Sequence, residues 1–254
     1  MTVSSERLRA GICFSQPTGV SWMSLGDDAL LGLLTAHLPY NTRLAVRDGT
    51  LVVVGTIPPV EGLDGRRAGW LGEVIGAAAA SVQTGAALGN GSEAASTGEL
   101  LEMARWVAAG KGWTALERKD SELRFSIPGE ADLPPLILSA FDGGFLVERA
   151  LPLLPARRAS ETVRWATAHA VLKLNGRFAF SRVVVRDPAA LSLTVGNRLP
   201  PDGDEDELDY FLEAVRHDAR HAMAVFECLR NDAVAVEYAI ANNLPEPREQ
   251  RMEV

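Results

Sequence analysis

Two stretches of the chain decide the fold: RLAVRDGTLVVVGTIPP, residues 43–59, and RVVVRDPAALSLTVGNRLPP, residues 182–201. Both begin with Arg-x-x-Val-Arg-Asp, continue as a β-rich run and end in a proline pair. Proline cannot donate a main-chain hydrogen bond to a sheet, so each proline pair marks the end of a strand. The recurrence predicts two copies of one structural unit.

Each stretch predicts a pair of strands. In the first, strands 42–47 and 50–57 flank Asp48-Gly49, a dipeptide typical of a two-residue hairpin turn. In the second, the predicted strands are 178–186 and 191–199, joined by a longer turn.

Helices are predicted before and after each strand pair. Ser24 is expected to cap the helix before the first pair and Ser160 the helix before the second. The long helix 63–84 follows the first pair, and an acidic start from Asp202 leads into the amphipathic helix after the second. The two later helices also align, because Trp70-Leu71 matches Phe211-Leu212 and Val74 matches Val215.

Further elements lie outside the repeated pattern. A hairpin is expected from 8–14 and 20–23, and a helix begins at the capping box of Ser96 and Glu99. Four short β runs then predict an antiparallel meander: 113–118, 122–127, 136–141 and 144–150. A final short helix is expected at 231–243.

These elements predict an α+β fold with a duplicated unit, the first copy being shortened. We expect the first copy at residues 1–88, a glycine-rich linker at 89–96, a complete copy at 97–230, and a C-terminal helix and polar tail at 231–254.

The composition indicates a globular protein. Hydrophobic residues make up 47% of the 254 residues and charged residues 23%, while the net charge is −8. The acidic balance argues against a broad contact with nucleic-acid phosphates and suits a partner with a basic surface. No apolar run is long enough to span a bilayer and the start is polar, so a cytoplasmic protein with two reduced thiols, Cys13 and Cys228, is expected. Each cysteine is expected to be a small buried hydrophobe.

One helical motif resembles a zinc site. His217-Asp218-Ala219-Arg220-His221 spaces two histidines four residues apart, as in H-E-x-x-H. Aspartate replaces the glutamate base, the flanking arginines oppose a cation, and both histidines lie off the apolar face. We therefore expect exposed histidines and no metal, and no cofactor is expected elsewhere. The acidic run Asp202 to Glu213 resembles part of an EF-hand loop, but Glu207 stands where that loop needs glycine, so a helix start is the expected reading.

Arginines recur at equivalent places in the repeated strands. Arg43 and Arg47 share one strand face, Arg182 and Arg186 share another, and both faces are expected to be exposed. The candidate partner-binding residues are these four arginines together with two apolar residues of the last long helix, Phe211 and Val215.

The order of helix, β-meander, helix, two strands, proline pair and helix resembles the bacterial YbjN family, which shares its fold with the class I chaperones of type III secretion. The resemblance covers residues 97 to about 230, most clearly the helix 159–174, the strands 178–199 and the helix 208–226. It implies a protein without catalytic residues, homodimeric like the secretion chaperones, that holds a client protein; YbjN proteins are associated with stress responses.

The leading hypothesis is therefore a non-enzymatic chaperone or adaptor that binds a client, for example a stress-response or nucleic-acid-handling protein. Two alternatives remain open. One is an enzyme whose site forms between the two halves, with His217 and His221 as candidates. The other is direct binding of single-stranded nucleic acid by the arginine-bearing strands.

Overall fold

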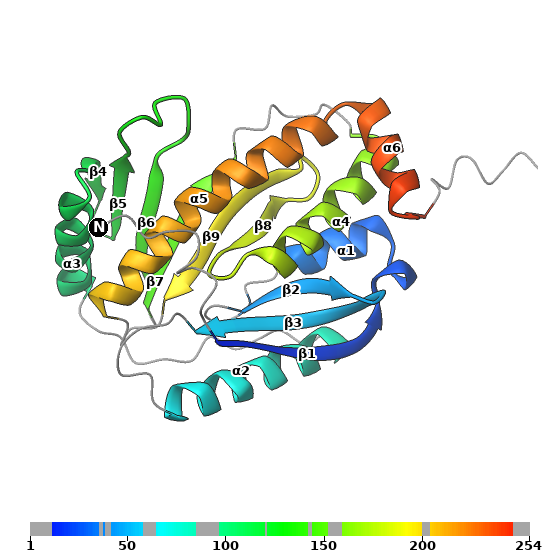
Figure 1. Cartoon of the computed structure of the whole chain (residues 1–254), viewed down its shortest axis with the longest axis horizontal. Coiled ribbons are helices and arrows are strands. Elements are labelled where there is room, and N and C mark those ends of the chain that lie inside the picture. Colours follow the sequence, from blue (N-terminus) through cyan, green and yellow to red (C-terminus); the bar gives the residue numbers. More distant parts are fainter. Residues whose placement is uncertain are drawn as a thin grey trace, which may run out of the picture.

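The computed structural model describes residues 12–35, 38, 42–57, 65–84, 97–119, 121–141, 144–151, 159–199 and 204–245. It is an α+β protein with two antiparallel sheets (Figure 1). The expected linker at 89–96, the helix cap at Ser96 and most of the polar tail lie outside the described residues.

The first half of the chain forms a three-stranded sheet with the strand order β1-β3-β2. Its elements are β1 (Ile12–Ser21), the 3-10 turn η2 (Trp22–Ser24), α1 (Asp27–Leu34), β2 (Thr42–Arg47), β3 (Thr50–Ile57) and α2 (Gly65–Thr84). The predicted bounds of β2 and β3 are confirmed. Asp48 and Gly49 between them both have positive φ, 49° and 77°, as the tight hairpin turn requires.

Two predictions for the start of the chain are wrong. The expected hairpin around Pro17 is one continuous strand, β1, which pairs with β3 along its length and has a register shift between Pro17 and Ser21. The shift accommodates the proline without reversing the strand. Ser24 does not cap α1: Gly26 is the N-cap residue, and the Ser24 hydroxyl donates to the main-chain oxygen of Ser21 instead.

The second half forms a six-stranded sheet with the order β4-β5-β6-β7-β9-β8. Its elements are α3 (Thr97–Gly110), β4 (Thr114–Lys119), β5 (Glu122–Ser126), β6 (Leu136–Phe141), β7 (Gly144–Ala150), α4 (Glu161–Arg177), β8 (Arg182–Asp187), β9 (Ser192–Leu199), α5 (Glu205–Leu229) and α6 (Asp232–Ala241). The predicted meander is confirmed, and Ser160 caps α4 as expected by accepting a hydrogen bond from the amide of Val163. β8 begins four residues later than the predicted strand.

The repeated unit is visible in the topology. The order β1-α1-β2-β3-α2 in the first half recurs as β7-α4-β8-β9-α5 in the second. The strand orders β1-β3-β2 and β7-β9-β8 also match. Among the described residues, the first copy has no counterpart of α3 and the three strands that precede β7, so it is the shorter one, as predicted.

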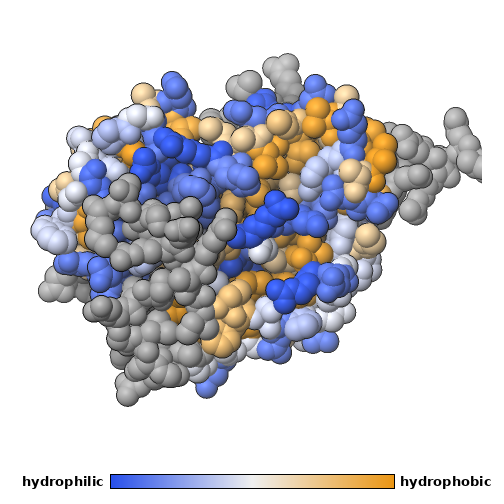
Figure 2. Space-filling model, viewed as in Figure 1, coloured by the Kyte–Doolittle hydropathy of each residue, from blue (hydrophilic) through white to orange (hydrophobic). Residues whose placement is uncertain are grey.

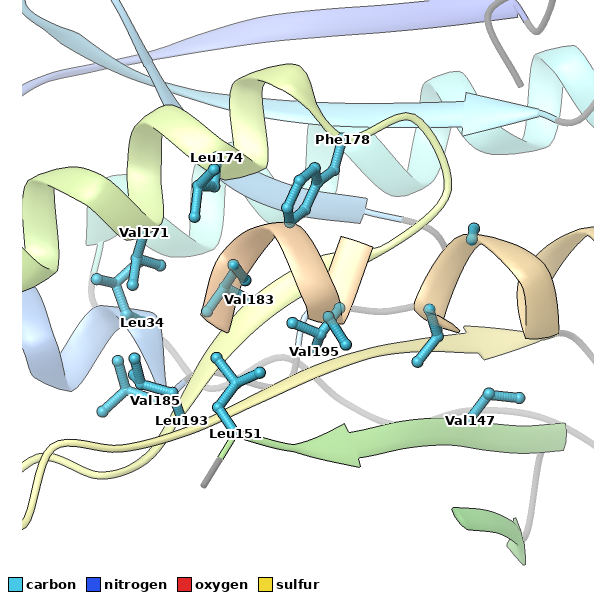
Figure 3. Close-up of a cluster of buried hydrophobic side chains, with 14 of the residues drawn as sticks. Leu34, Val147, Leu151, Val171, Leu174, Phe178, Val183, Val185, Leu193 and Val195 are labelled. Carbon is cyan, nitrogen blue, oxygen red and sulfur yellow. The ribbon is translucent and has the colours of Figure 1, made fainter. Parts of the chain in front are cut away.

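The two halves pack against each other through equivalent elements. α4 lies on β2, while α1 contacts both α4 and β8, so the three-stranded sheet lies between α4 and α2 (Figure 1). One buried apolar cluster runs through both halves. Figure 3 shows Leu34 of α1 beside Val171 of α4 and Val185 of β8. This shared core positions the residues described next.

Candidate protein-binding surface

Arg43 and Arg182 are buried, which overturns the prediction that they lie on exposed strand faces. Only 3% of Arg43 and 4% of Arg182 is exposed, and Val184, between Arg182 and Arg186, is buried as well. The reason is tertiary: α4 from the second half covers β2, and α1 from the first half contacts β8.

Each of these arginines donates to main-chain oxygens of the opposite half. Nε of Arg43 donates to the oxygen of Asn175 in the last turn of α4 at 2.6 Å. Nη1 of Arg182 donates to the oxygens of Leu38 and Thr42 at 2.9 and 2.8 Å. A cation at the C-terminus of α4 is favoured by the helix dipole. The two residues therefore join the halves of the chain.

Arg47 and Arg186 lie at the far ends of the same strands and are exposed. Arg47 donates to the hydroxyl of Ser15 on β1 at 3.3 Å. Arg186 forms an ion pair with Glu148 on β7. Of the four candidate arginines, only these two are open to solvent.

Phe211 and Val215 lie on the inner face of α5 and are both completely buried. The ring of Phe211 contacts Phe180 edge to face, with 6.4 Å between the ring centroids. In this conformation neither residue is accessible to another molecule, so both act as core residues.

His217 and His221 are exposed, as predicted. Nδ1 of His217 lies 3.0 Å from Oδ1 of Asp218, and this contact raises the pKa of His217 against the opposing effect of partial burial. The other carboxylate oxygen of Asp218 accepts from the buried Ser181 hydroxyl at 2.5 Å. Since the serine contacts the aspartate and not a histidine, this group lacks the serine–histidine hydrogen bond of a nucleophilic triad. Within the described residues, no group of three or more histidines, cysteines or acids is placed to hold a metal.

A buried carboxylate lies under α5. Glu130, whose side chain is fully buried, contacts Nη1 of Arg149 and accepts from Nε of Arg216 at 2.6 Å, while Nη2 of Arg220 lies 2.9 Å away. Burial raises the pKa of Glu130, but hydrogen bonds and charge from Arg216 and Arg149 outweigh it and hold the pKa below its usual value. This cluster fixes the connection between β5 and β6 on α5.

Cys13 and Cys228 are free thiols and both are exposed, so their predicted burial is wrong. Cys13 lies on β1, at the edge of the three-stranded sheet, and Cys228 faces away from the core near the end of α5. Each lies on the solvent side of its element.

The outer edge of β4 is the surface that sequence reasoning missed. β4 pairs only with β5 among the described strands. Leu116, at a register shift in β4, is 60% exposed, and Trp106 on α3, which contacts β4, is 67% exposed. A signal for Trp106 exists in the sequence, because it lies off the apolar face formed by Leu101, Ala104 and Ala108. Leu116 has no such signal, since the register shift depends on pairing with β5.

The edge of the three-stranded sheet at β1 differs in character from the edge at β4. β1 exposes Cys13, Ser15, Gln16 and Pro17 along its length. A proline and polar side chains make an edge strand resistant to pairing with another chain. Compared with β1, the edge of β4 therefore has the stronger combination of open main chain and apolar side chains.

Acidic residues lie at the same end of the molecule as β4. Glu205 and Asp206 are exposed at the start of α5, and the side chain of Glu102 on α3 is 62% exposed. α3 contacts both β4 and α5, as Figure 1 shows. Lys111, directly after α3, forms ion pairs with two residues of α5, Asp209 and, at 3.1 Å, Glu213.

Apolar side chains are also exposed on α6. Val234, Val236 and Ile240 are 36%, 44% and 72% exposed. In Figure 2 apolar residues gather over α6, whereas hydrophilic residues cover the middle of α5. A helix already satisfies its own main-chain groups, so α6 offers side-chain contacts but no strand pairing.

Comparison with family models finds no match, and comparison with curated proteins finds no significant match. Among solved structures, one similar chain belongs to the heterodimeric ExoU–SpcU complex from the type III secretion system of Pseudomonas aeruginosa. The two chains are 21% identical, with a TM-score of 0.35, and the likeness covers 48% of this chain and 94% of that chain. Membership of the YbjN family stays a prediction.

Proposed function

We propose that this protein is a non-enzymatic binding module, a chaperone or adaptor, that holds an extended segment of a partner protein along the outer edge of β4. The observation that supports this most strongly is the open edge of β4, on which Leu116 is exposed, together with the exposed Trp106 on α3, the helix that contacts β4. An added strand gains main-chain hydrogen bonds from such an edge, and neighbouring side chains select its sequence.

The side chains near β4 define the segment that fits. Leu116 and Trp106 favour an apolar residue, because a large exposed aromatic residue is a frequent centre of binding energy. Glu205 and Asp206, exposed at the start of α5, favour basic residues next to it.

The finer expectations belong to the same proposal. The client is a protein with a basic surface, as the acidic composition suggests, and the site of action is the cytoplasm. A homodimer remains a prediction, and it would need a surface beyond the contact between the two halves. A link to stress responses rests on the family resemblance alone.

Neither alternative gains an observation in its favour. Two of the four arginines proposed to contact nucleic acid are buried between the halves. The histidines proposed for an enzyme are exposed, and Ser181 contacts Asp218 instead of a histidine.

The test is capture of partners from cell lysate by the immobilised full chain, followed by quantitative mass spectrometry. We expect the same partner proteins to be recovered reproducibly by the wild type and to be reduced at least about tenfold by Leu116→Lys or Trp106→Ala. Ile240→Lys is the matched control, because it places a lysine on the equally exposed apolar surface of α6.

Circular dichroism of all variants establishes that they fold. Equal recovery by Leu116→Lys and wild type would contradict the assignment to β4. Loss with Ile240→Lys alone would move the site to α6, and no reproducible partner from stressed or unstressed cells would overturn the proposed function.

A further inference from the structure

The interface between the two halves contains two buried guanidinium groups, those of Arg43 and Arg182. Within the described residues, neither forms an ion pair with a carboxylate. Their donors reach main-chain oxygens of Asn175, Leu38 and Thr42, and Arg43 also donates to the hydroxyl of Thr56 at 3.1 Å. Buried charges are normally paired, because removing an ion from water is costly.

The two arginines differ in how their charge is balanced. Burial lowers the pKa of Arg43 to about 10, and the nearby Cys13 and Asp218 oppose this effect. Burial lowers the pKa of Arg182 to about 9, and the charges of Arg198, Arg186 and Arg43 lower it further. Since an arginine keeps its charge at neutral pH, Arg182 is a buried cation in a positive environment.

A pocket opens beside these two residues. It is a small cavity of about 10 Å³ that opens to solvent, and it is lined by Arg43, Arg182 and Asn175 together with leucines and valines of both halves. Nε of Arg182 is buried and has no hydrogen-bond partner. Leaving a buried donor without a partner is costly, so an acceptor in this pocket that reaches Nε would be stabilising.

We propose that this pocket binds a small inorganic anion, such as chloride, between Arg43 and Arg182. The anion balances the charge of Arg182 and contacts both halves, so its binding stabilises their packing. A monatomic anion suits the site because the cavity is too small for a larger ligand.

The experiment uses bromide as the probe. Crystals of the full chain grown or soaked in sodium bromide are expected to show an anomalous peak between Arg43 and Arg182. In solution, sodium bromide or chloride is expected to raise the Tm by at least about 2 °C over sodium gluconate at equal ionic strength.

Arg182→Met is expected to remove this halide-dependent rise, whereas Arg186→Met, on the exposed end of the same strand, is expected to keep it. If Arg182→Met does not fold, the wild-type anomalous map decides. The proposal is overturned if no anomalous peak lies in the pocket, or if halides and gluconate give the same Tm.

Discussion

Arg43 and Arg182 stand at equivalent positions of the two repeated strands, and each donates to main-chain oxygens in the half of the chain to which the other belongs. The same arginine of the repeat thus contacts the opposite copy from each side of the interface. A residue pair that looks like a sequence motif acts as a reciprocal clamp between two copies of one fold.

Replacing Arg43 with alanine is expected to lower the free energy of unfolding by about 2–4 kcal/mol. The change leaves the oxygen of Asn175 and the hydroxyl of Thr56 without their donor and opens a space in the interface. Arg47→Ala, at the exposed end of the same strand, is expected to cost less than about 0.5 kcal/mol. Urea denaturation measures the free energy of unfolding of both variants. Equal losses would contradict the role of Arg43 in joining the two halves.

Two glycines, Gly55 in β3 and Gly196 in β9, should respond differently to alanine. A Cβ on Gly196 would lie 2.7 Å from the main-chain oxygen of Val147, whereas one on Gly55 would lie 2.7 Å from the end of the flexible Ile75 side chain. The main chain of β7 is held on both sides by β6 and β9, but Ile75 can change rotamer. We expect Gly196→Ala to cost about 3 kcal/mol and Gly55→Ala about 1 kcal/mol in unfolding experiments. The reverse order would show that β7 yields more readily than α2.

Glu130→Gln is expected to destabilise the protein by about 3 kcal/mol, because it leaves Arg149 buried without a counter-charge. Glu122→Gln breaks the more exposed ion pair with Arg124 and should cost less than about 1 kcal/mol. Chemical denaturation measures the loss of unfolding free energy in each variant. Similar losses would show that the burial of Glu130 does not make its ion pairs more important than an exposed one.

The same carboxylate predicts a pH dependence. The pKa of Glu130 in the folded state is below its usual value of about 4.3. The contribution of the ionised carboxylate to the free energy of unfolding is therefore complete above that pH. The contribution is then lost as the pH falls through the lowered pKa. The difference in unfolding free energy between wild type and Glu130→Gln should therefore shrink in acid, and a constant difference down to the acid transition would refute this account.

His169 predicts a second pH effect. Its ring contacts Trp22, with centroids 4.9 Å apart, and Nδ1 lies 3.0 Å from the Tyr238 hydroxyl. Burial, aided by the charge of Lys173, lowers the pKa of His169 to about 4. The unfolded chain binds a proton near pH 6.5 while the folded chain does not, so stability falls by up to about 1.4 kcal/mol per pH unit from 6.5 to 4.

Comparing His169→Gln with its parent across this pH range measures the effect, and the variant is expected to lose the slope. The parent should carry His217→Gln, because the raised pKa of His217 gives a contribution of opposite sign that is present at low pH and lost as the pH rises. An unchanged slope in His169→Gln would show that other groups titrate there.

Much of the architecture follows from local sequence. Asp48-Gly49 and the proline pairs set the first hairpin and the strand ends, and the recurrence of the phrase predicted a repeated unit, which the matching strand orders β1-β3-β2 and β7-β9-β8 confirm. These features depend on neighbouring residues, whose main-chain preferences act over a few positions.

The environment of each strand face was decided by tertiary structure. Alternation along β2 places Arg43 and Arg47 on one face, but it does not show that α4, more than a hundred residues later, covers the Arg43 end. The register shift that exposes Leu116 likewise depends on β5. A sequence specifies which side chains share a surface, whereas burial depends on which distant element packs there. Distant elements cover Arg43 and Arg182 but leave the outer edge of β4 exposed.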